Sequence, residues 1–466
     1  MCRSSADGGR RCVESAATTA KRNLRKRLGR AKGDEAAQLQ AQIDNIDEAT
    51  SKYGNFVSPL QLPIPEKVQH LLDAFDNTDG TPLLVGGTVR DALLAQGEVP
   101  KDFDIEIHGM SIDEVATTLR EKGYRADLVG QQFGVIKTYA GNEEIDLSVP
   151  RSDSLTGVGH QGFTVEMDPQ MGVVQASERR DFTLNAMMYD PKLGVCIDPH
   201  GGRNDLEQGR LRHVSDAFAE DPLRPLRGFQ FASRYGFTIA PETLEMCQSL
   251  RQEFDSISQE RVVVEWEKFY GKSHHPSKGL QSLTDMGWAD TVPEFDSIDL
   301  AAADRVMESK SKERPVLLAA VLTSNMSDEG SKAFVESTVD GKKQQQRIHA
   351  LSRSTPPSLI DRASVRQWAR TLGQKGLSIQ DWYHKEEAIN PQSSRLQQVK
   401  TAADKEGLFN TAPISSLTGK DVFALYPDKK GGLWMGELLR KAEAAEDAGE
   451  FTDKDGALQW LRRELD

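Results

Sequence analysis

A glycine pair between a short apolar run and a helix-like segment constrains this chain more than any other feature. In "LLVGGTVRDALL", residues 83–94, Gly86 and Gly87 follow the apolar run and precede residues with helical spacing. After a short loop, a second apolar segment, "DFDIEI", carries Asp102 and Asp104. The order strand, glycine turn, helix, strand indicates a mixed α/β unit. Its glycine turn exposes backbone N–H groups at a helix start, where a phosphate binds well.

Two carboxylates follow the glycine turn within one predicted strand. In an extended strand, residues i and i+2 share a face, so Asp102 and Asp104 point the same way. Such carboxylates suit Mg²⁺, which usually takes one or two of them together with substrate phosphates and water. Asp146 stands on a candidate neighbouring strand, and Arg90, one turn into the helix, adds a cation. A lone D-x-D pair is more often a solvated turn, but glycines, arginine and D-x-D in this order favour a phosphate and metal site.

The remaining periodicity divides the 466 residues into an α/β part and a helical part. Helix patterns occur at 65–75 and 111–124, and strand patterns follow at 133–140 and 143–151. Beyond residue 221 the apolar residues recur with helical spacing. A chain of this length is expected to form several domains. No run of about 20 apolar residues is present, so we expect no membrane span.

The N-terminal region differs in charge from the whole chain, whose formal net charge is -13. Residues 1–32 hold ten basic residues against Asp7 and Glu14, and the composition of residues 21–49 predicts a polar helix. This composition fits a mitochondrial targeting leader, a basic arm that touches RNA, or a leader without function. The four cysteines show no C-x-x-C pairing, which favours a reducing compartment and a cytoplasmic protein.

The motifs together resemble a known family. The opening stretch and "KDFDIEI" are similar to the signature of the class II tRNA nucleotidyltransferases, the CCA-adding enzymes, and of the related bacterial poly(A) polymerases. The resemblance continues in order through "RSDSLTGVGHQGFTV", "ERRDFTLNAMMYD", "IDPHGGRNDLEQGRLRHV", "EDPLRPLRGFQFASRYGF" and "ISQERVVVEWEK". A weaker resemblance returns in "SLTGKDVFAL" and the segment from residue 431 to residue 461.

The resemblance implies a role for each matching residue. It places catalysis on Asp102, Asp104 and Asp146, the metal on Asp102 and Asp104, and nucleotide binding on Gly86, Gly87, Arg90, Arg180, Asp181, Asn185, Asp221, Arg224, Arg227 and Gln230. Asp181 is also expected to cap the following helix. Asp221 and Arg224, on one helix face, would accept from the exocyclic amine of C or A and donate to its ring nitrogen. At position 230 this chain has a glutamine, Gln230, where many bacterial members of the family carry an arginine.

The resemblance also implies an architecture and an activity. We expect an α+β, polymerase-beta-like nucleotidyltransferase head followed by a mainly α-helical neck, body and tail. The predicted boundaries are 1–62 for a basic extension, 63–190 for the head, 191–290 for the base-selecting neck, and 291–466 for the tRNA-binding body and tail. The expected reaction is Mg²⁺-dependent, template-free addition of C, C and A to tRNA from CTP and ATP. The alternatives are a poly(A) polymerase, a partial CC-adding or A-adding enzyme, and an inactive RNA- or nucleotide-binding module.

Overall fold

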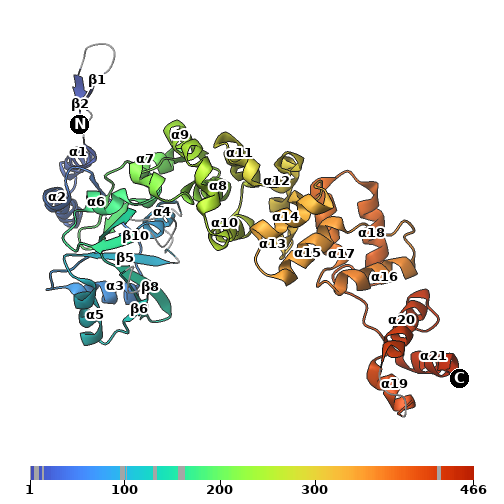
Figure 1. Ribbon diagram of the computed structural model, residues 1–466. Coiled ribbons are helices and arrows are strands. Elements are labelled where there is room, and N and C mark those ends of the chain that lie inside the picture. The colour runs from blue at the N-terminus through green and yellow to red at the C-terminus, as the bar shows by residue number, and fades with distance from the viewer. Residues whose placement is uncertain are drawn as a thin grey trace. The chain divides into compact units, whose positions relative to one another are not determined.

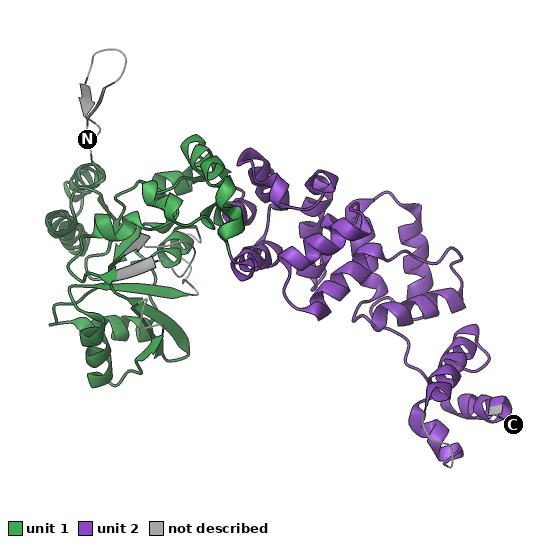
Figure 2. Ribbon diagram, viewed as in Figure 1, with its two compact units in different colours: residues 1–228, 237–257 green, residues 229–236, 258–466 purple. Residues whose placement is uncertain are grey.

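The computed structural model describes residues 2–4, 10–12, 15–94, 100, 102–129, 134–155, 163–427 and 432–465. The chain forms two compact units (Figure 2). Unit 1 is Met1–Gly228 with Phe237–Ile257, and unit 2 is Phe229–Gly236 with Ser258–Asp466. The division falls inside helix α8, Arg224–Tyr235, within the range predicted for a neck. None of the helices in the described ranges combines the length and hydropathy that a membrane span requires.

The core of unit 1 is a mixed sheet (Figure 1). Its eight strands lie in the order β3 (Val57–Pro59), β12 (Val195–Ile197), β11 (Met188–Asp190), β4 (Thr81–Val85), β5 (Phe103–His108), β8 (Glu143–Ser148), β7 (Val135–Ala140) and β6 (Asp127–Val129). β5 and β8 are parallel, and the other neighbouring strands are antiparallel. The predicted hairpin of β7 and β8 is confirmed, with Gly141 at positive φ in its turn.

Two N-terminal helices pack on this sheet. Where one polar helix was predicted for residues 21–49, the chain forms α1, Ala16–Leu28, and α2, Asp34–Tyr53. Their apolar residues share one buried cluster with strand residues such as Val85 and Val195. The regular spacing of small and apolar residues among the charges supplies that buried face.

The other elements of unit 1 are short. They are β1 (Cys2–Ser4), β2 (Arg10–Cys12), α3 (Glu66–Leu72), η1 (Asp73–Phe75), α4 (Gly87–Leu94), α5 (Ile112–Glu121), β9 (Arg151–Leu155), β10 (Phe163–Met167), α6 (Val173–Glu178), η2 (Thr183–Asn185), α7 (Gly202–Glu207), β13 (Arg210–Leu211), η3 (Asp216–Glu220), β14 (Thr238–Ile239), α9 (Pro241–Ser249) and η4 (Arg251–Ser256). β9 and β10 form an antiparallel pair. The glycines of the sequence between them lie outside the described residues.

Unit 2 is helical, as predicted. Its helices are α10 (Gln259–Lys272), α11 (Pro276–Asp285), η5 (Ala289–Thr291), η6 (Phe295–Ser297), α12 (Leu300–Glu308), α13 (Arg314–Leu322), α14 (Asp328–Thr338), α15 (Lys342–Arg353), α16 (Arg362–Gly373), α17 (Ile379–Ile389), α18 (Ser394–Lys405), α19 (Gly419–Leu425), α20 (Leu433–Ala448) and α21 (Lys454–Leu465). Phe229 of α8 packs on Trp266 and Phe269 of α10, with ring centroids 4.8 and 4.7 Å away.

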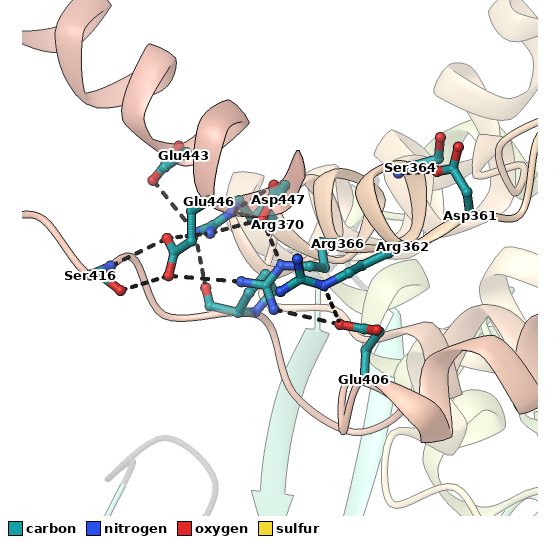
Figure 3. Close-up of polar contacts among 11 residues, drawn as sticks. Asp361, Arg362, Ser364, Arg366, Arg370, Glu406, Ser416, Glu443, Glu446 and Asp447 are labelled. Atoms are coloured by element: carbon teal, nitrogen blue, oxygen red, sulfur yellow. Dashed lines mark hydrogen bonds and ion pairs between the residues drawn. The ribbon is translucent and has the colours of Figure 1, made fainter. Parts of the chain in front are cut away.

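Charged side chains attach α20 to α16 within unit 2 (Figure 3). Arg366 Nε donates to Asp447 Oδ1 over 2.9 Å, and Arg370 Nη2 donates to Glu446 Oε2 over 3.1 Å. Ser416 Oγ donates to the other Glu446 oxygen over 2.7 Å. Glu446 and Asp447 are buried, so their charges need these partners for the helices to pack.

Candidate active site

Three carboxylates meet where β5 and β8 run parallel. Asp104 of β5 is directly in register with Asp146 of β8, so both side chains lie on one face of the sheet. Asp102 stands just before β5, two residues from Asp104. This confirms the prediction that Asp146 lies on a strand beside the D-x-D pair.

Thr88 of α4 holds the backbone of the D-x-D segment in place. Its hydroxyl donates to the Asp102 carbonyl over 3.1 Å and accepts from the Asp104 N–H over 3.0 Å. The helix after the glycine turn is therefore tied directly to the strand that carries the carboxylates. Sequence reasoning did not single out Thr88, although its place next to Gly87 was a usable signal.

The electrostatics of the carboxylates favour a cation. Desolvation by the surrounding protein raises the pKa of Asp104. The charge of Arg180 opposes this shift, the carboxylates of Asp146 and Asp102 add to it, and Arg90 opposes it. Asp146 Oδ1 is buried without a hydrogen-bond partner, and Lys137 Nζ lies 3.9 Å from it. Crowded carboxylate oxygens with an unsatisfied acceptor are suited to a hard divalent ion. Within the described part of the chain, no three His, Cys, Asp or Glu side chains could hold a metal ion as a group.

The glycine turn brings an arginine close to the start of α4. Gly86 has φ 62°, and a Cβ at this position would lie 2.9 Å from Arg180 Nη1. A side chain there would therefore strain the backbone and displace Arg180. Gly87 is the first residue of α4, as the strand, turn and helix pattern predicted.

Arg90 is buried, and hydrogen bonds link its side chain to a series of other polar side chains. Its Nη1 donates to Asn185 Oδ1 over 2.5 Å, and Asn185 Nδ2 donates to Asp181 Oδ1 over 2.9 Å. Asp181 Oδ2 in turn accepts from Arg227 Nε over 2.7 Å. The structure thus connects four of the predicted nucleotide-binding residues to one another.

Asp181 does not have the capping role that was expected for it. The residue before η2 is Phe182, and no side chain caps that short helix. Burial favours the neutral form of Asp181, but the charge of Arg227 and the hydrogen bonds from Asn185, Phe182 and Arg227 lower its pKa to about 2. Asp181 is therefore an ionised anchor for Arg227.

Glu106 is a site residue that the sequence reasoning missed. Its side chain is fully buried on β5, and its Oε2 accepts from Arg179 Nη2 over 3.2 Å and lies 3.5 Å from Arg180 Nη2. His108 Nε2 is 3.0 Å from its other oxygen. Burial raises the pKa of Glu106, but the His108 hydrogen bond and the charges of Arg180, His108 and Arg179 outweigh it and lower the pKa to about 2. The two-residue spacing that identified Asp102 and Asp104 extends to Glu106 and was the available signal.

Asp221 and Arg224 do not share a helix face, contrary to the expectation. α8 begins at Arg224, and Asp221 has extended backbone angles before it. Asp221 Oδ1 accepts from the Leu223 N–H over 3.1 Å, which fits a turn in "DPLRP". Arg224 donates to the carbonyls of Ala217 and Arg179 over 2.7 and 2.6 Å. The two prolines of this segment disfavour an earlier helix start.

Gln230 belongs to the part of α8 that lies in unit 2. Its side chain is buried, and its Nε2 has no hydrogen-bond partner. Its nucleotide contact stays a prediction.

The arrangement in unit 1 suits chemistry on a polyphosphate. Asp104 and Asp146 lie side by side on the sheet next to Asp102, and Arg180 lies beside the glycine turn. Charge-assisted donors and a cation are what a phosphoryl or nucleotidyl group requires while it is transferred.

Two family models match the chain. Residues 83–212 match the model described as "Poly A polymerase head domain". Residues 236–299 match the model described as "Probable RNA and SrmB- binding site of polymerase A". All three carboxylates fall within the first range.

Relatives by sequence are proteins named multifunctional CCA protein. The one from Aliivibrio salmonicida is 39% identical over 221 residues, which are 46% of this chain and 51% of that protein. The one from Xylella fastidiosa strain M23 is 43% identical over 184 residues, or 38% of this chain and 42% of that protein. The chain spans about half the length of the curated relatives it matches.

Solved structures extend the likeness in fold to most of the chain. The Bacillus stearothermophilus CCA-adding enzyme in complex with CTP has a TM-score of 0.65 at 21% identity, covering 86% of this chain and 98% of that one. The Thermotoga maritima CCA-adding enzyme complexed with tRNA has a TM-score of 0.57 at 19% identity, covering 86% and 97%. The predicted fold class, an α/β head followed by mainly helical parts, is confirmed.

Proposed function

We propose that this chain, which belongs to the family of class II CCA-adding enzymes and bacterial poly(A) polymerases, adds C, C and A to the 3' end of tRNA. The substrates would be CTP and ATP, and pyrophosphate would be released. The observation that carries the proposal is the alignment of Asp104 with Asp146, beside Asp102 and near Arg180. Relatives named for CCA addition support the choice of reaction.

Asp102 and Asp104 would hold Mg²⁺, with Asp146 beside them. When bound, Mg²⁺ supplies positive charge that activates the RNA 3'-hydroxyl and stabilises the leaving pyrophosphate. Arg180 would bind the triphosphate, held by the buried carboxylate of Glu106. The backbone N–H of Gly87, the first residue of α4, would contribute a further donor to the phosphates.

Asp221 and Arg224 would select the base. A carboxylate accepts from the exocyclic amine of cytosine or adenine, while a guanidinium donates to the ring nitrogen beside it. Guanine and uracil present a keto oxygen in place of the amine and would leave polar groups unpaired. The carbonyls of Ala217 and Arg179 hold the Arg224 guanidinium in one orientation, which supports such selection.

Extension of a tRNA that lacks CCA tests the proposal. With CTP and ATP together, the wild type is expected to add three nucleotides; with CTP alone it is expected to stop after C and C. Long A tracts with ATP alone would identify a poly(A) polymerase instead. Asp102→Ala with Asp104→Ala should abolish incorporation, while Asp113→Ala, an exposed acidic residue on α5, should leave it unchanged. Equal incorporation by the double variant would show that the site is misassigned.

A further inference from the structure

The exposed side of α1 is strongly basic. From Ser15 to Gly33 the chain has seven basic residues and no acidic one, although its formal net charge is -13. Arg22, Arg25 and Lys26 are exposed on α1. With Thr18 and Lys21 they line a depression of about 500 Å³, as far as the described residues show. We call Arg22, Arg25 and Lys26 the α1 basic face.

The opposite side of α1 anchors the helix to the head. Ala17 and Leu24 are buried in the cluster that contains residues of α2 and of the sheet, and Ala20 and Leu28 pack against it. Lys21 adds an ion pair of 2.7 Å with Asp47 of α2. The α1 basic face therefore belongs to the same compact unit as the carboxylates. A cleaved leader that included α1 would open this core, so the targeting interpretation does not fit these residues.

The chemistry of the face points to one kind of partner. Three cations at spacings of one to four residues on a helix suit a row of phosphates rather than a single carboxylate. A helix that binds membranes inserts an apolar face among the lipids. In α1 that apolar face is already packed against the head. An RNA backbone needs only the exposed cations.

We infer that the α1 basic face binds the sugar-phosphate backbone of the RNA whose 3' end the head extends. This inference rests on the proposed function. It assigns a substrate contact to a region outside the two ranges that the family models match. The contact would be independent of sequence, because phosphates carry no base information.

The test compares two triple variants of the full chain. One carries Arg22→Gln, Arg25→Gln and Lys26→Gln. The control removes the same charge from exposed residues elsewhere on the head, with Lys67→Gln, Lys122→Gln and Arg125→Gln. Fluorescence polarisation would measure the Kd for a tRNA lacking CCA over a series of salt concentrations. Thermal unfolding would verify that both variants fold.

The α1 variant is expected to bind this RNA about tenfold more weakly, and the slope of log Kd against log salt should become shallower by about 2, since each lost phosphate contact removes roughly 0.7–0.9. KM for the RNA should rise while KM for CTP stays unchanged. The control should match the wild type. Equal Kd and slope in both variants would overturn the inference, as would weakened binding to phosphatidylserine vesicles with unchanged RNA binding. If the wild type binds RNA through this face but incorporates no nucleotide, the proposed function fails and the RNA contact stands.

Discussion

Replacing Glu106 by glutamine tests how the head holds its arginines. The substitution keeps the shape of the side chain and removes its charge. Glu106 contacts Arg179, Arg180 and His108 and is fully buried. We expect the variant to lose stability and to bind nucleotides less well, because two guanidinium groups lose their shared counter-charge.

The size of the effect follows from the pKa of Glu106. A lowering from 4.5 to about 2, at roughly 1.4 kcal/mol per pKa unit, corresponds to about 3 kcal/mol of stability supplied by the ionised form. Removing one partner of a buried ion pair typically destabilises a protein by about 3–5 kcal/mol, a range that includes the value obtained from the pKa. Since Arg180 is the proposed triphosphate ligand, KM for CTP and ATP should rise about tenfold, with a smaller change in kcat.

The dependence of the unfolding free energy on pH tests whether the charge of Glu106 causes the stabilisation. Because the folded-state pKa lies below the ordinary value, the carboxylate stabilises the fold fully above pH 4.5. This contribution is lost as the pH falls from 4.5 towards 2. Denaturant unfolding of wild type and Glu106→Gln should therefore differ by about 3 kcal/mol at pH 7 and converge towards the lower end of that window.

The control is Glu143→Gln, the same chemical change at an exposed position on β8. It should alter stability by less than about 0.5 kcal/mol. An unfolding free energy of Glu106→Gln equal to that of the wild type at pH 7 would contradict this role of the Glu106 charge. A difference that persisted unchanged near pH 2 would refute it too.

Three further predictions concern the carboxylates and the packing of the tail. Asp104→Asn should lower nucleotide incorporation by several kcal/mol of transition-state stabilisation, about a thousandfold, without lowering the melting temperature, because the raised pKa shows that the fold disfavours this charge. Thr88→Val should cost about 1–2 kcal/mol in denaturant unfolding and reduce incorporation, while Thr88→Ser keeps the hydroxyl and should behave like the wild type. Arg370→Gln should cost about 3 kcal/mol in denaturant unfolding, because Glu446 and Asp447 stay buried, whereas the exposed Arg440→Gln should not.

Local sequence patterns were enough to predict the order of the elements in the head and which of its carboxylates share a face. Local rules sufficed for this, because two-residue strand periodicity aligns Asp102 with Asp104, and a glycine pair after an apolar run marks the turn before α4. The two strands of the hairpin that carries Asp146 could also be predicted from local sequence, because only a short turn at Gly141 separates them.

Which partners the charged residues take depends on long-range contacts of the fold. Glu106 and Arg180 are far apart in sequence, and Asp181 meets Arg227 only because the chain folds back on itself. The same holds for α1, whose charges are typical of an exposed arm but whose small apolar residues pack on the sheet. Sequence patterns report which face of an element is apolar or charged. What that face meets depends on long-range packing, which no local pattern encodes.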